Sequence, residues 1–254
     1  MDLGLTDRVV LVTGGAGAIG TATCRLFASE GARVAVHYHR SRAAAVALAA
    51  EVGGTFHGAD LRNEGDVEAL FSLVRAQHGR VDVCVANAGH YPTEEAGLHE
   101  LSATRWEQTL GDNLRSVFLT ARAFLREVAG RGKGNLVMVS SNSGHIGEPG
   151  RADYAAAKAA ITHGLLPSLK NEIFHLAPEG RVNVVAPART VAGASTRDAW
   201  NPSVATTAMR KLGRPDDVAH AVVWLASDTA AGHVNGAVVA VNGGMEGRLL
   251  HPPP

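Results

Sequence analysis

The turn that follows the first apolar run restricts the fold of this chain more than any other segment. The run Val9–Val12 leads directly into a glycine-rich turn, which then enters an alanine-rich stretch. Gly15, Gly17 and Gly20 have the spacing G-x-G-x-x-G between a predicted strand and a predicted helix. Glycine allows the backbone to turn tightly and to approach a pyrophosphate, which the exposed amides of a helix N-terminus bind. The segment therefore predicts a dinucleotide site in the first βαβ unit.

Short β-branched runs alternate with longer amphipathic stretches along the rest of the chain, which is typical of βαβ units. The predicted strands are Arg8–Val12, Arg33–His37, Thr55–His57, Val81–Val85, Leu136–Ser140, Val182–Ala186 and Ala237–Val241. The predicted helices are Ala18–Glu30, Ser41–Glu51, Glu64–Gln77, Thr104–Ala129, Asp153–Phe174 and Pro215–Ala226. A (β/α)8 barrel shares this alternation. The glycine-rich turn favours an α/β fold with a doubly wound, Rossmann-type parallel sheet of about seven strands and helices on both faces.

No linker or internal repeat interrupts the alternation, so we expect residues 1–254 to form a single dinucleotide-binding and catalytic domain. The segment Ala188–Leu212 is weakly periodic and contains many small residues. We predict a mobile substrate loop there, because such loops lie at the surface and carry function.

The composition argues against several classes of partner. The 24 basic and 24 acidic residues cancel, and no basic stripe with interleaved aromatics predicts binding to nucleic acid. No apolar run approaches the ~20 residues of a membrane span, and Met1–Asp7 lacks the features of a signal peptide. We therefore expect a cytoplasmic protein. Cys24 and Cys84 lie in apolar periodic segments and are expected to be buried and free, and no histidine spacing predicts a metal site.

Tyr154 and Lys158 are four residues apart within a run of strong helix formers, and Ser141 lies 154 − 141 = 13 positions before the tyrosine. Residues four apart share a helix face, so the ammonium group can favour the phenolate and lower a pKa that is about 10 when unperturbed. The tyrosine is then a usable proton donor, and Ser141 can hold the carbonyl oxygen that receives the proton. A solvated pair has the same spacing, and the glycine-rich turn favours the catalytic interpretation. Ser140 and Ser143 lie in the same loop, and Ser143 is the alternative to Ser141.

The end of the second predicted strand indicates which dinucleotide is preferred. An NAD site usually has an acid about 20 residues beyond the turn, where it holds the ribose hydroxyls. The segment His37–Arg42 contains no acid, and Arg40, Ser41 and Arg42 instead offer donors to a 2′-phosphate. We therefore expect NADP(H) in preference to NAD(H). A solvated helix start is the alternative.

With these segments in view, the chain resembles the compact short-chain dehydrogenase/reductase family over nearly its whole length, and in particular its 3-oxoacyl-[acyl-carrier-protein] reductases. The turn is similar to the family's T-G-x-x-x-G-x-G, with Thr13, Gly14 and Gly20 matching and Ala18 in place of the middle glycine. Two late segments, Gly213–Val218 and Val241–Gly244, are also similar to family segments.

The resemblance implies roles for further residues. Asp60 would contact the adenine, Asn87-Ala88-Gly89 would lie beside the adenosine ribose, and Asn113 would hold a relay water. Lys158 would also hold the nicotinamide ribose. The catalytic residues that we expect are Asn113, Ser141, Tyr154 and Lys158. The cofactor contacts that we expect are Gly14, Gly15, Gly17, Ile19, Gly20, Tyr38, His39, Arg40, Ser41, Asp60, Leu61, Asn87, Ala88, Gly89, Tyr154, Lys158, Pro187 and Thr190.

The chain departs from the family pattern in two places. Ala188 follows Pro187 where glycine is common, and Ala192 replaces a threonine whose contact with the nicotinamide we assign to Thr190. Gly17 stands where many NADP-preferring relatives have a basic residue, so we expect a moderate preference.

The predicted activity is an oxidoreductase that transfers hydride between a nicotinamide cofactor and a small carbonyl or alcohol substrate. The alternatives are a non-catalytic dinucleotide sensor or scaffold, a sugar-nucleotide epimerase or dehydratase, and, among reductases, a 3-oxoacyl thioester reductase. Arg131 and Lys133 could meet an acidic carrier protein, and His90, Tyr91 and His145 are candidates for contact with substrate. The resemblance implies a homotetramer or homodimer.

Overall fold

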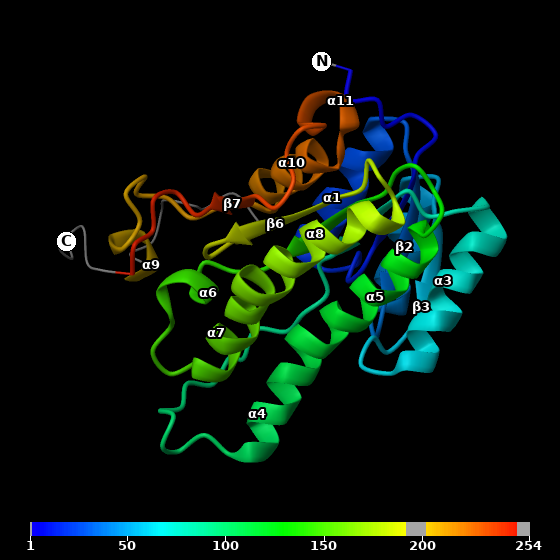
Figure 1. The fold of residues 1–254 in the computed structure, drawn as a ribbon. Coiled ribbons are helices and arrows are strands. Elements are labelled where there is room, and N and C mark those ends of the chain that lie inside the picture. The colour runs from blue at the N-terminus through cyan, green and yellow to red at the C-terminus, as the bar shows by residue number, and fades with distance from the viewer. Residues whose placement is uncertain (1, 192–201, 248–254) are drawn as a thin grey trace.

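The computed structural model describes residues 2–191 and 202–247, and a parallel sheet lies at its centre (Figure 1). Within these residues the sheet has seven strands in the order β3-β2-β1-β4-β5-β6-β7. The strands are β1 (Val9–Val12), β2 (Arg33–Tyr38), β3 (Thr55–Gly58), β4 (Val83–Ala86), β5 (Asn135–Val139), β6 (Arg181–Pro187) and β7 (Val238–Val241). All neighbouring pairs run parallel, and each strand lies within two residues of its predicted bounds. The predicted Rossmann-type α/β fold is confirmed.

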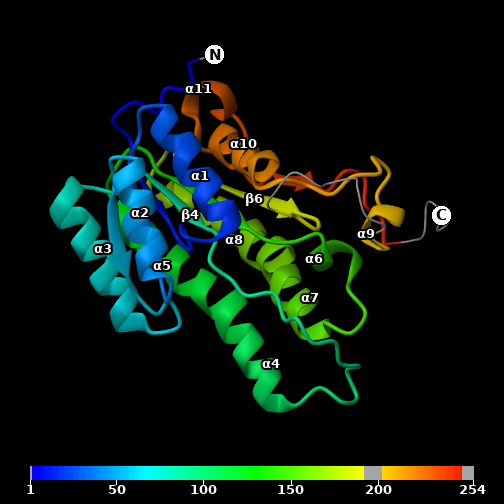
Figure 2. The ribbon, with the colours of Figure 1, turned by 180° about the vertical axis from the view of Figure 1, so that it is seen from behind.

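Helices cover both faces of the sheet (Figures 1 and 2). One face carries α1 (Ala18–Ser29), α2 (Arg42–Glu51) and α10 (Pro215–Ala226), which Figure 2 shows in front of the sheet. The other carries α3 (Glu64–His78), α5 (Ser116–Val128) and α8 (Leu166–Leu176). These helices start and stop by local chemistry. Asn63, for example, caps α3 by accepting bonds from two backbone amides, and Gly79 ends it at a φ of 84°.

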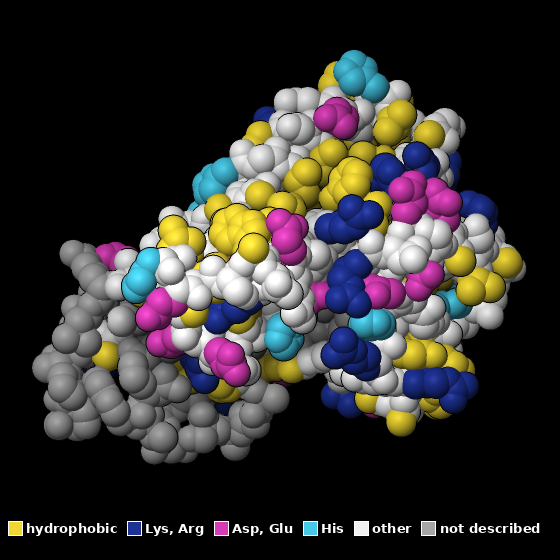
Figure 3. All heavy atoms as spheres, turned by 90° about the horizontal axis from the view of Figure 1, so that it is seen from below, with side chains coloured by type: hydrophobic (Ala, Val, Ile, Leu, Met, Phe, Trp, Pro, Cys, Tyr) yellow, Lys and Arg dark blue, Asp and Glu magenta, His cyan; other side chains and the backbone are white. Residues whose placement is uncertain are grey.

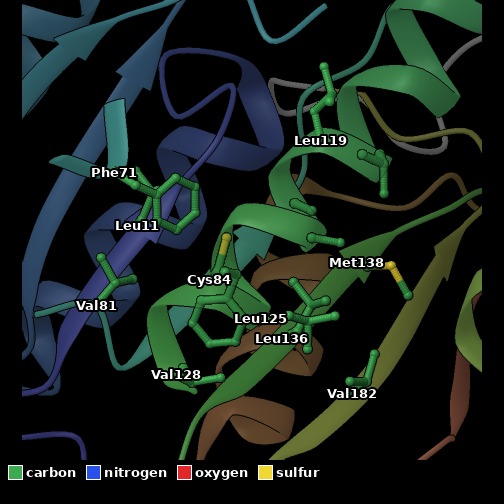
Figure 4. Close-up of a cluster of buried hydrophobic side chains, with 14 of the residues drawn as sticks. Leu11, Phe71, Val81, Cys84, Leu119, Leu125, Val128, Leu136, Met138 and Val182 are labelled. Carbon is green, nitrogen blue, oxygen red and sulfur yellow. The ribbon is translucent and has the colours of Figure 1, made fainter. Parts of the chain in front are cut away.

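The two faces explain why the strands read as continuous apolar runs. Val9 and Leu11 of β1 belong to the core under α3 and α5, whereas Val10 and Val12 belong to the core under α1 and α10. Alternate side chains of a strand point to opposite faces, so a sheet covered on both sides needs apolar residues at every position. Figure 4 shows part of the first core, where Leu11, Cys84 and Leu136 lie together. A fully buried leucine such as Leu11 or Leu136 contributes roughly 1.5–3 kcal/mol.

Two predicted helices are interrupted, and the expectation of unbroken helices is wrong. The first consists of α4 (Ala103–Leu110), the π-helical turn η1 (Gly111–Arg115) and α5. The second consists of α7 (Ala152–Ala159), the π-helical turn η2 (Ala160–Leu165) and α8. Each π turn contains a glycine, which has low helix propensity, and such turns occur often at functional sites. Periodicity alone does not reveal a single inserted residue.

Three short helices are not anticipated by the sequence pattern: α6 (Ser143–Ile146), α9 (Pro202–Ala205) and α11 (Asp228–Ala231). They are too short for a 3.6-residue period to show. The predicted substrate loop Ala188–Leu212 contains α9, and residues 192–201 of that loop lie outside the described residues.

The strand order reverses between β1 and β4, and in open α/β sheets ligands bind outside the carboxyl ends of the strands at such a point. Basic and acidic side chains are interspersed on the face seen in Figure 3. None of the helices in the described ranges combines the length and apolar character that crossing a membrane requires. Cys24 and Cys84 are free and buried, as predicted.

Candidate active site

The glycine-rich turn leaves open backbone at the start of α1. Gly17 is the N-cap residue and has no side chain to cap the helix, so the first amides of α1 keep free N–H groups. A Cβ at Gly20 would collide with the carbonyl oxygen of Gly14, and Gly14 has a φ of +62°. Both positions therefore require glycine, and the turn keeps a surface onto which a pyrophosphate fits.

The segment after β4 is tied to this turn through Thr13. The Thr13 hydroxyl donates to the carbonyl of Val85 at 3.1 Å and accepts bonds from the amides of Asn87 at 2.9 Å and Ala88 at 3.0 Å. The Asn87 side chain donates back to the carbonyl of Thr13 at 2.9 Å. The structure thus brings together two expected cofactor segments that are more than seventy residues apart in sequence.

His37 is a buried residue of this region that the sequence pattern did not single out. Its Nδ1 accepts the amide of Gly14 at 3.0 Å, and its Nε2 lies 3.1 Å from the carbonyl oxygen of Ala59. These partners require a neutral ring whose proton is on Nε2. Burial lowers the pKa of His37 to about 4. The hydrogen bond to the carbonyl of Ala59 raises this pKa, but by less than burial lowers it. The neutral ring holds the turn against the end of β3.

This geometry predicts acid sensitivity. His37 has a pKa near 6.5 in the unfolded chain and about 4 in the folded one, so its stabilising effect is complete above pH 6.5 and is lost as the pH falls toward 4. The unfolding free energy should fall by about 1.4 kcal/mol per pH unit in this window on account of this group. Urea unfolding of wild type and of His37→Asn at several pH values isolates its share. Parallel pH profiles for the two proteins would contradict it.

The residues expected to contact the adenosine lie at the carboxyl ends of β2 and β3. Asp60 is bound by Arg62, whose Nη2 lies 2.7 Å from Asp60 Oδ2, and this hydrogen bond lowers the pKa of Asp60 to about 2. His39 lies 3.8 Å from the same carboxylate. Leu61 points into the apolar core, so only its backbone is free to meet a ligand. Ser41 is the N-cap residue of α2, and its hydroxyl makes no capping bond.

Tyr154 and Lys158 lie on α7, beside the loop that follows β5. Of the three serines in that segment, Ser140 is buried and donates to the carbonyl of Lys158 at 2.8 Å. Ser141 is the serine of this segment whose hydroxyl acts on the Tyr154 phenol, where it lowers the pKa. Its oxygen also contacts the hydroxyl of Ser143 at 3.2 Å. Ser141 is also the serine that the spacing argument favours.

The sequence-based expectation of a lowered pKa for Tyr154 is wrong for this structure. Burial raises the pKa of Tyr154 to about 12, the Ser141 bond opposes this, and the charge of Glu148 adds to it. Burial also lowers the pKa of Lys158 to about 8, and the Lys158 Nζ lies 5.6 Å from the Tyr154 ring centroid. Burial disfavours the charged form of each group, which is the phenolate of Tyr154 and the ammonium of Lys158. The phenol therefore keeps its proton firmly.

Asn113 and Gly89 lie next to Lys158. The Asn113 side chain donates to the carbonyl of His90 at 2.9 Å and to that of Thr109 at 3.1 Å, and it accepts the His90 amide at 3.1 Å. A Cβ at Gly89 would lie 2.7 Å from Asn113 Oδ1 and 3.4 Å from Lys158 Nζ. The π turn η1 thus places Asn113 against the segment after β4, and Gly89 allows the close approach.

Comparison with known proteins finds relatives over nearly the whole chain. The family model described as enoyl-(acyl carrier protein) reductase matches residues 14–246. Cis-4-hydroxycyclohexanecarboxylate dehydrogenase of Sinomonas cyclohexanicum is 37% identical over 94% of this chain and 96% of its own. The 3-oxoacyl-[acyl-carrier-protein] reductase of Synechocystis is 33% identical over 95% and 98%, and the acetoacetyl-CoA reductase of Allochromatium vinosum is 34% identical over 94% and 98%.

The chain belongs to the short-chain dehydrogenase/reductase family. It is an NAD(P)-dependent oxidoreductase, as the sequence predicted.

The expected cofactor contacts Pro187 and Thr190 lie at the end of β6 and in the loop after it. The carbonyl of Pro187 accepts the amide of Asn142 at 2.7 Å, so β6 is fastened to the loop that carries Ser141. Thr190 pairs with Gly213 in an isolated bridge, and its hydroxyl donates to the carbonyl of Ala188 at 3.0 Å. These bonds hold the loops after β5 and β6 side by side at the carboxyl ends of the strands.

The candidate substrate residues differ in their placement. Tyr91 packs edge-on against Tyr154, with ring centroids 5.2 Å apart. His145 makes a similar contact with His163, also at 5.2 Å. His90 is engaged by its backbone with Asn113. Glu148 accepts hydrogen bonds from the hydroxyls of Tyr91 and Ser143. Sequence reasoning missed this residue, because a carboxylate in a short loop has no distinctive spacing.

Proposed function

We propose that this oxidoreductase interconverts a small ketone and its alcohol with NADP(H), using Tyr154 as general acid and base. The observation that carries the proposal is the convergence of Ser141, Tyr154 and Lys158 at the carboxyl ends of the strands, beside the open glycine turn. When bound, the nicotinamide supplies or accepts the hydride.

Each residue has a defined part in this proposal. Ser141 hydrogen-bonds the carbonyl oxygen, and Tyr154 donates a proton to that oxygen. Lys158 holds the ribose hydroxyls and returns a proton to Tyr154. Asn113 fixes the His90 segment through its side chain and leaves its backbone to position a relay water. Because burial keeps Tyr154 protonated at neutral pH, reduction is favoured there, and oxidation should accelerate as the pH rises.

A substrate that bears a carboxylate is favoured by Arg189. This exposed residue follows β6 at the edge of the sheet where Ser141 lies, and its charge acts on the phenol of Tyr91. Its side chain has no hydrogen-bond or ion-pair partner within residues 2–191 and 202–247. The Sinomonas relative is named for a substrate of this kind, cis-4-hydroxycyclohexanecarboxylate.

Two relatives are named for thioester substrates, and these form the second candidate class. Arg131 and Lys133 do not favour an acidic carrier, since Arg131 pairs with Asp82 at 2.6 Å and Lys133 with Glu179 at 3.1 Å. Arg131 also donates to the carbonyl of Val81, just before β4, at the opposite edge of the sheet from Tyr154.

The deciding experiment is a steady-state assay with NADPH absorbance as readout. The panel contains 4-oxocyclohexanecarboxylate, its uncharged methyl ester, and acetoacetyl-CoA. We expect the highest kcat/KM with the free carboxylate. A preference for the ester would remove the role of Arg189, a preference for the thioester would favour the second class, and turnover of none with either cofactor would reject ketone reduction.

The preference for NADP(H) is supported by the groups at the start of α2. Arg40 is exposed and has no side-chain partner in the described part of the chain. The hydroxyl of Ser41 is not used as a cap. Arg42 lies over the ring of Phe56, 5.9 Å from its centroid, and remains exposed. These donors fit a 2′-phosphate, to which arginine binds with two parallel hydrogen bonds.

Replacing Tyr38 by Asp and Arg40 by Leu should shift the preference toward NADH. The new carboxylate would accept bonds from free ribose hydroxyls and repel the phosphate. A hydrogen bond to a charged group contributes ~1.5–3 kcal/mol, so the loss of Arg40 alone should change the ratio by about tenfold or more. The measurement is kcat/KM for NADPH divided by that for NADH, in both proteins. A wild-type ratio below one would contradict the preference.

We further propose a homotetramer or homodimer in the cytoplasm. The edge strand β7 is only partly covered, and Phe118 on α5 and Trp224 on α10 are exposed, which suits pairing of subunits. Light scattering that returned the monomer mass of 26.4 kDa would contradict the oligomer. The free, buried cysteines suit a reducing compartment, and cell fractionation tests the location.

A further inference from the structure

Glu148 lies in the loop between α6 and α7, outside the four residues to which a catalytic role has been given. Its Oε1 accepts the hydroxyl of Tyr91 and lies 3.2 Å from Arg151 Nη1, and its Oε2 accepts the hydroxyl of Ser143. All its partners come from segments that border the substrate side. The Glu148 carboxylate thus binds three other side chains and is not a solvated surface charge.

Through these partners, Glu148 is connected to both hydroxyl groups proposed to act on the substrate, those of Ser141 and Tyr154. On one side, Ser143 accepts the hydroxyl of Ser141 at 3.2 Å and donates its amide to the same oxygen at 3.2 Å. On the other side, Tyr91 packs edge-to-face on Tyr154 at an interplanar angle of 84°. Ser143 gives its single proton to Glu148, so its oxygen faces Ser141 only as an acceptor. This determines where the Ser141 oxygen lies and where its proton points.

Arg151 fixes the carboxylate in place. It is 9% exposed, its Nε donates to the carbonyl of Pro92 at 2.9 Å, and its Nη1 also contacts Glu95 at 3.0 Å. Its guanidinium lies 4.7 Å from the Tyr91 ring centroid. The Glu148 carboxylate is half-buried, and the rigid guanidinium of Arg151 determines its orientation.

We propose that Glu148 is a positioning residue for carbonyl reduction: through Ser143 it orients the Ser141 hydroxyl, and through Tyr91 it holds the ring of Tyr154. The proposal rests on the function proposed above. When a carbonyl oxygen arrives, the Ser141 proton turns from Ser143 to that oxygen by rotation about one bond, while the oxygen of Ser141 stays in place. Glu148 itself forms no covalent bond and transfers no proton.

The carboxylate also has an electrostatic signature at Tyr154. After burial and the Ser141 bond, the charge of Glu148 is the further influence on the pKa of Tyr154, and it raises that pKa. A neutral residue in its place should therefore lower the pKa of the phenol. The other charged and titratable groups on the elements packed around Tyr154 are Asp153 and Lys158 on α7, Arg105 and Glu107 on α4, Asp112 and Arg115 on η1, His145 on α6 and His163 on η2, together with Tyr91 and Arg151 from the adjoining loops.

The test compares Glu148→Gln, Ser143→Ala and the control Glu95→Gln. Glutamine keeps the shape and removes the charge. We expect Glu148→Gln to lower kcat by about tenfold or more with little change in the substrate KM, since the loss falls on an oriented hydroxyl. The ionisation in the pH profile of alcohol oxidation should move to lower pH. Ser143→Ala should lower kcat similarly and leave that ionisation in place, because Glu148 remains.

Glu95→Gln removes the other carboxylate that pairs with Arg151. The Glu95 side chain is 70% exposed and is not bonded to Ser141 or Ser143, so this variant should resemble wild type. Cofactor titration and circular dichroism establish that each variant is folded. Wild-type kcat and an unmoved ionisation in folded Glu148→Gln would overturn the proposal. Should that variant fail to fold, unchanged kcat in Ser143→Ala would overturn it alone. Failure of the proposed function is separate, since wild type itself would then reduce none of the panel.

Discussion

Tyr154→Phe should abolish most of the turnover while the protein still binds its cofactor. Phenylalanine keeps the buried ring and its edge contact with Tyr91, and it removes only the hydroxyl that carries the proton. General acid catalysis contributes ~10²–10⁴-fold, so kcat should fall by about that factor. Steady-state kinetics with the best ketone of the panel measures it.

The control for Tyr154→Phe is titration of NADPH fluorescence, which should give the wild-type dissociation constant. Retention of more than about a tenth of wild-type kcat would show that another group donates the proton. Because burial holds the pKa of Tyr154 at about 12, the wild-type reduction rate should stay level through neutral pH. A decline that began below pH 8 would point to a donor with a lower pKa.

Lys158→Ala should impair turnover and cofactor binding together. The ammonium is buried and donates to the carbonyl of Val139 at 3.1 Å, so its removal also leaves a buried carbonyl without its partner. Its proposed bonds to the ribose hydroxyls are charge-assisted, and their loss should raise the cofactor Kd by about tenfold or more. Loss of proton return should lower kcat by ~10²-fold.

The matched controls for this change are Lys158→Met and Lys133→Ala. Methionine refills the buried volume without the charge, so it separates packing from chemistry, and it should be as inactive as alanine. Lys133 is paired with Glu179 at the protein surface, and its removal should leave kcat and Kd unchanged. An unaltered cofactor Kd in both Lys158 variants would reject the ribose contact, even if kcat fell.

Local sequence patterns predicted the elements of the fold well, because both faces of the sheet are covered. Strands such as β1 and β5 need apolar side chains at every position, and such runs are visible without any tertiary information. Gly14 and Gly20 could also be predicted from the sequence. No other residue fits at these two positions, so glycine itself marks the turn. Pattern failed at η1 and η2, where one extra residue per turn leaves the hydrophobic period almost unchanged.

In the candidate site too, some features could be predicted from the sequence and others only from the tertiary structure. The order and spacing of Ser141, Tyr154 and Lys158 identified the reaction class from sequence, since a helix places residues four apart on one face. Their ionisation was decided by burial, which reversed the expected direction for the Tyr154 pKa. His37 and Glu148 emerged only from tertiary structure. Their partners come from other strands and loops, and contacts between residues distant in the chain leave no periodic trace in the sequence.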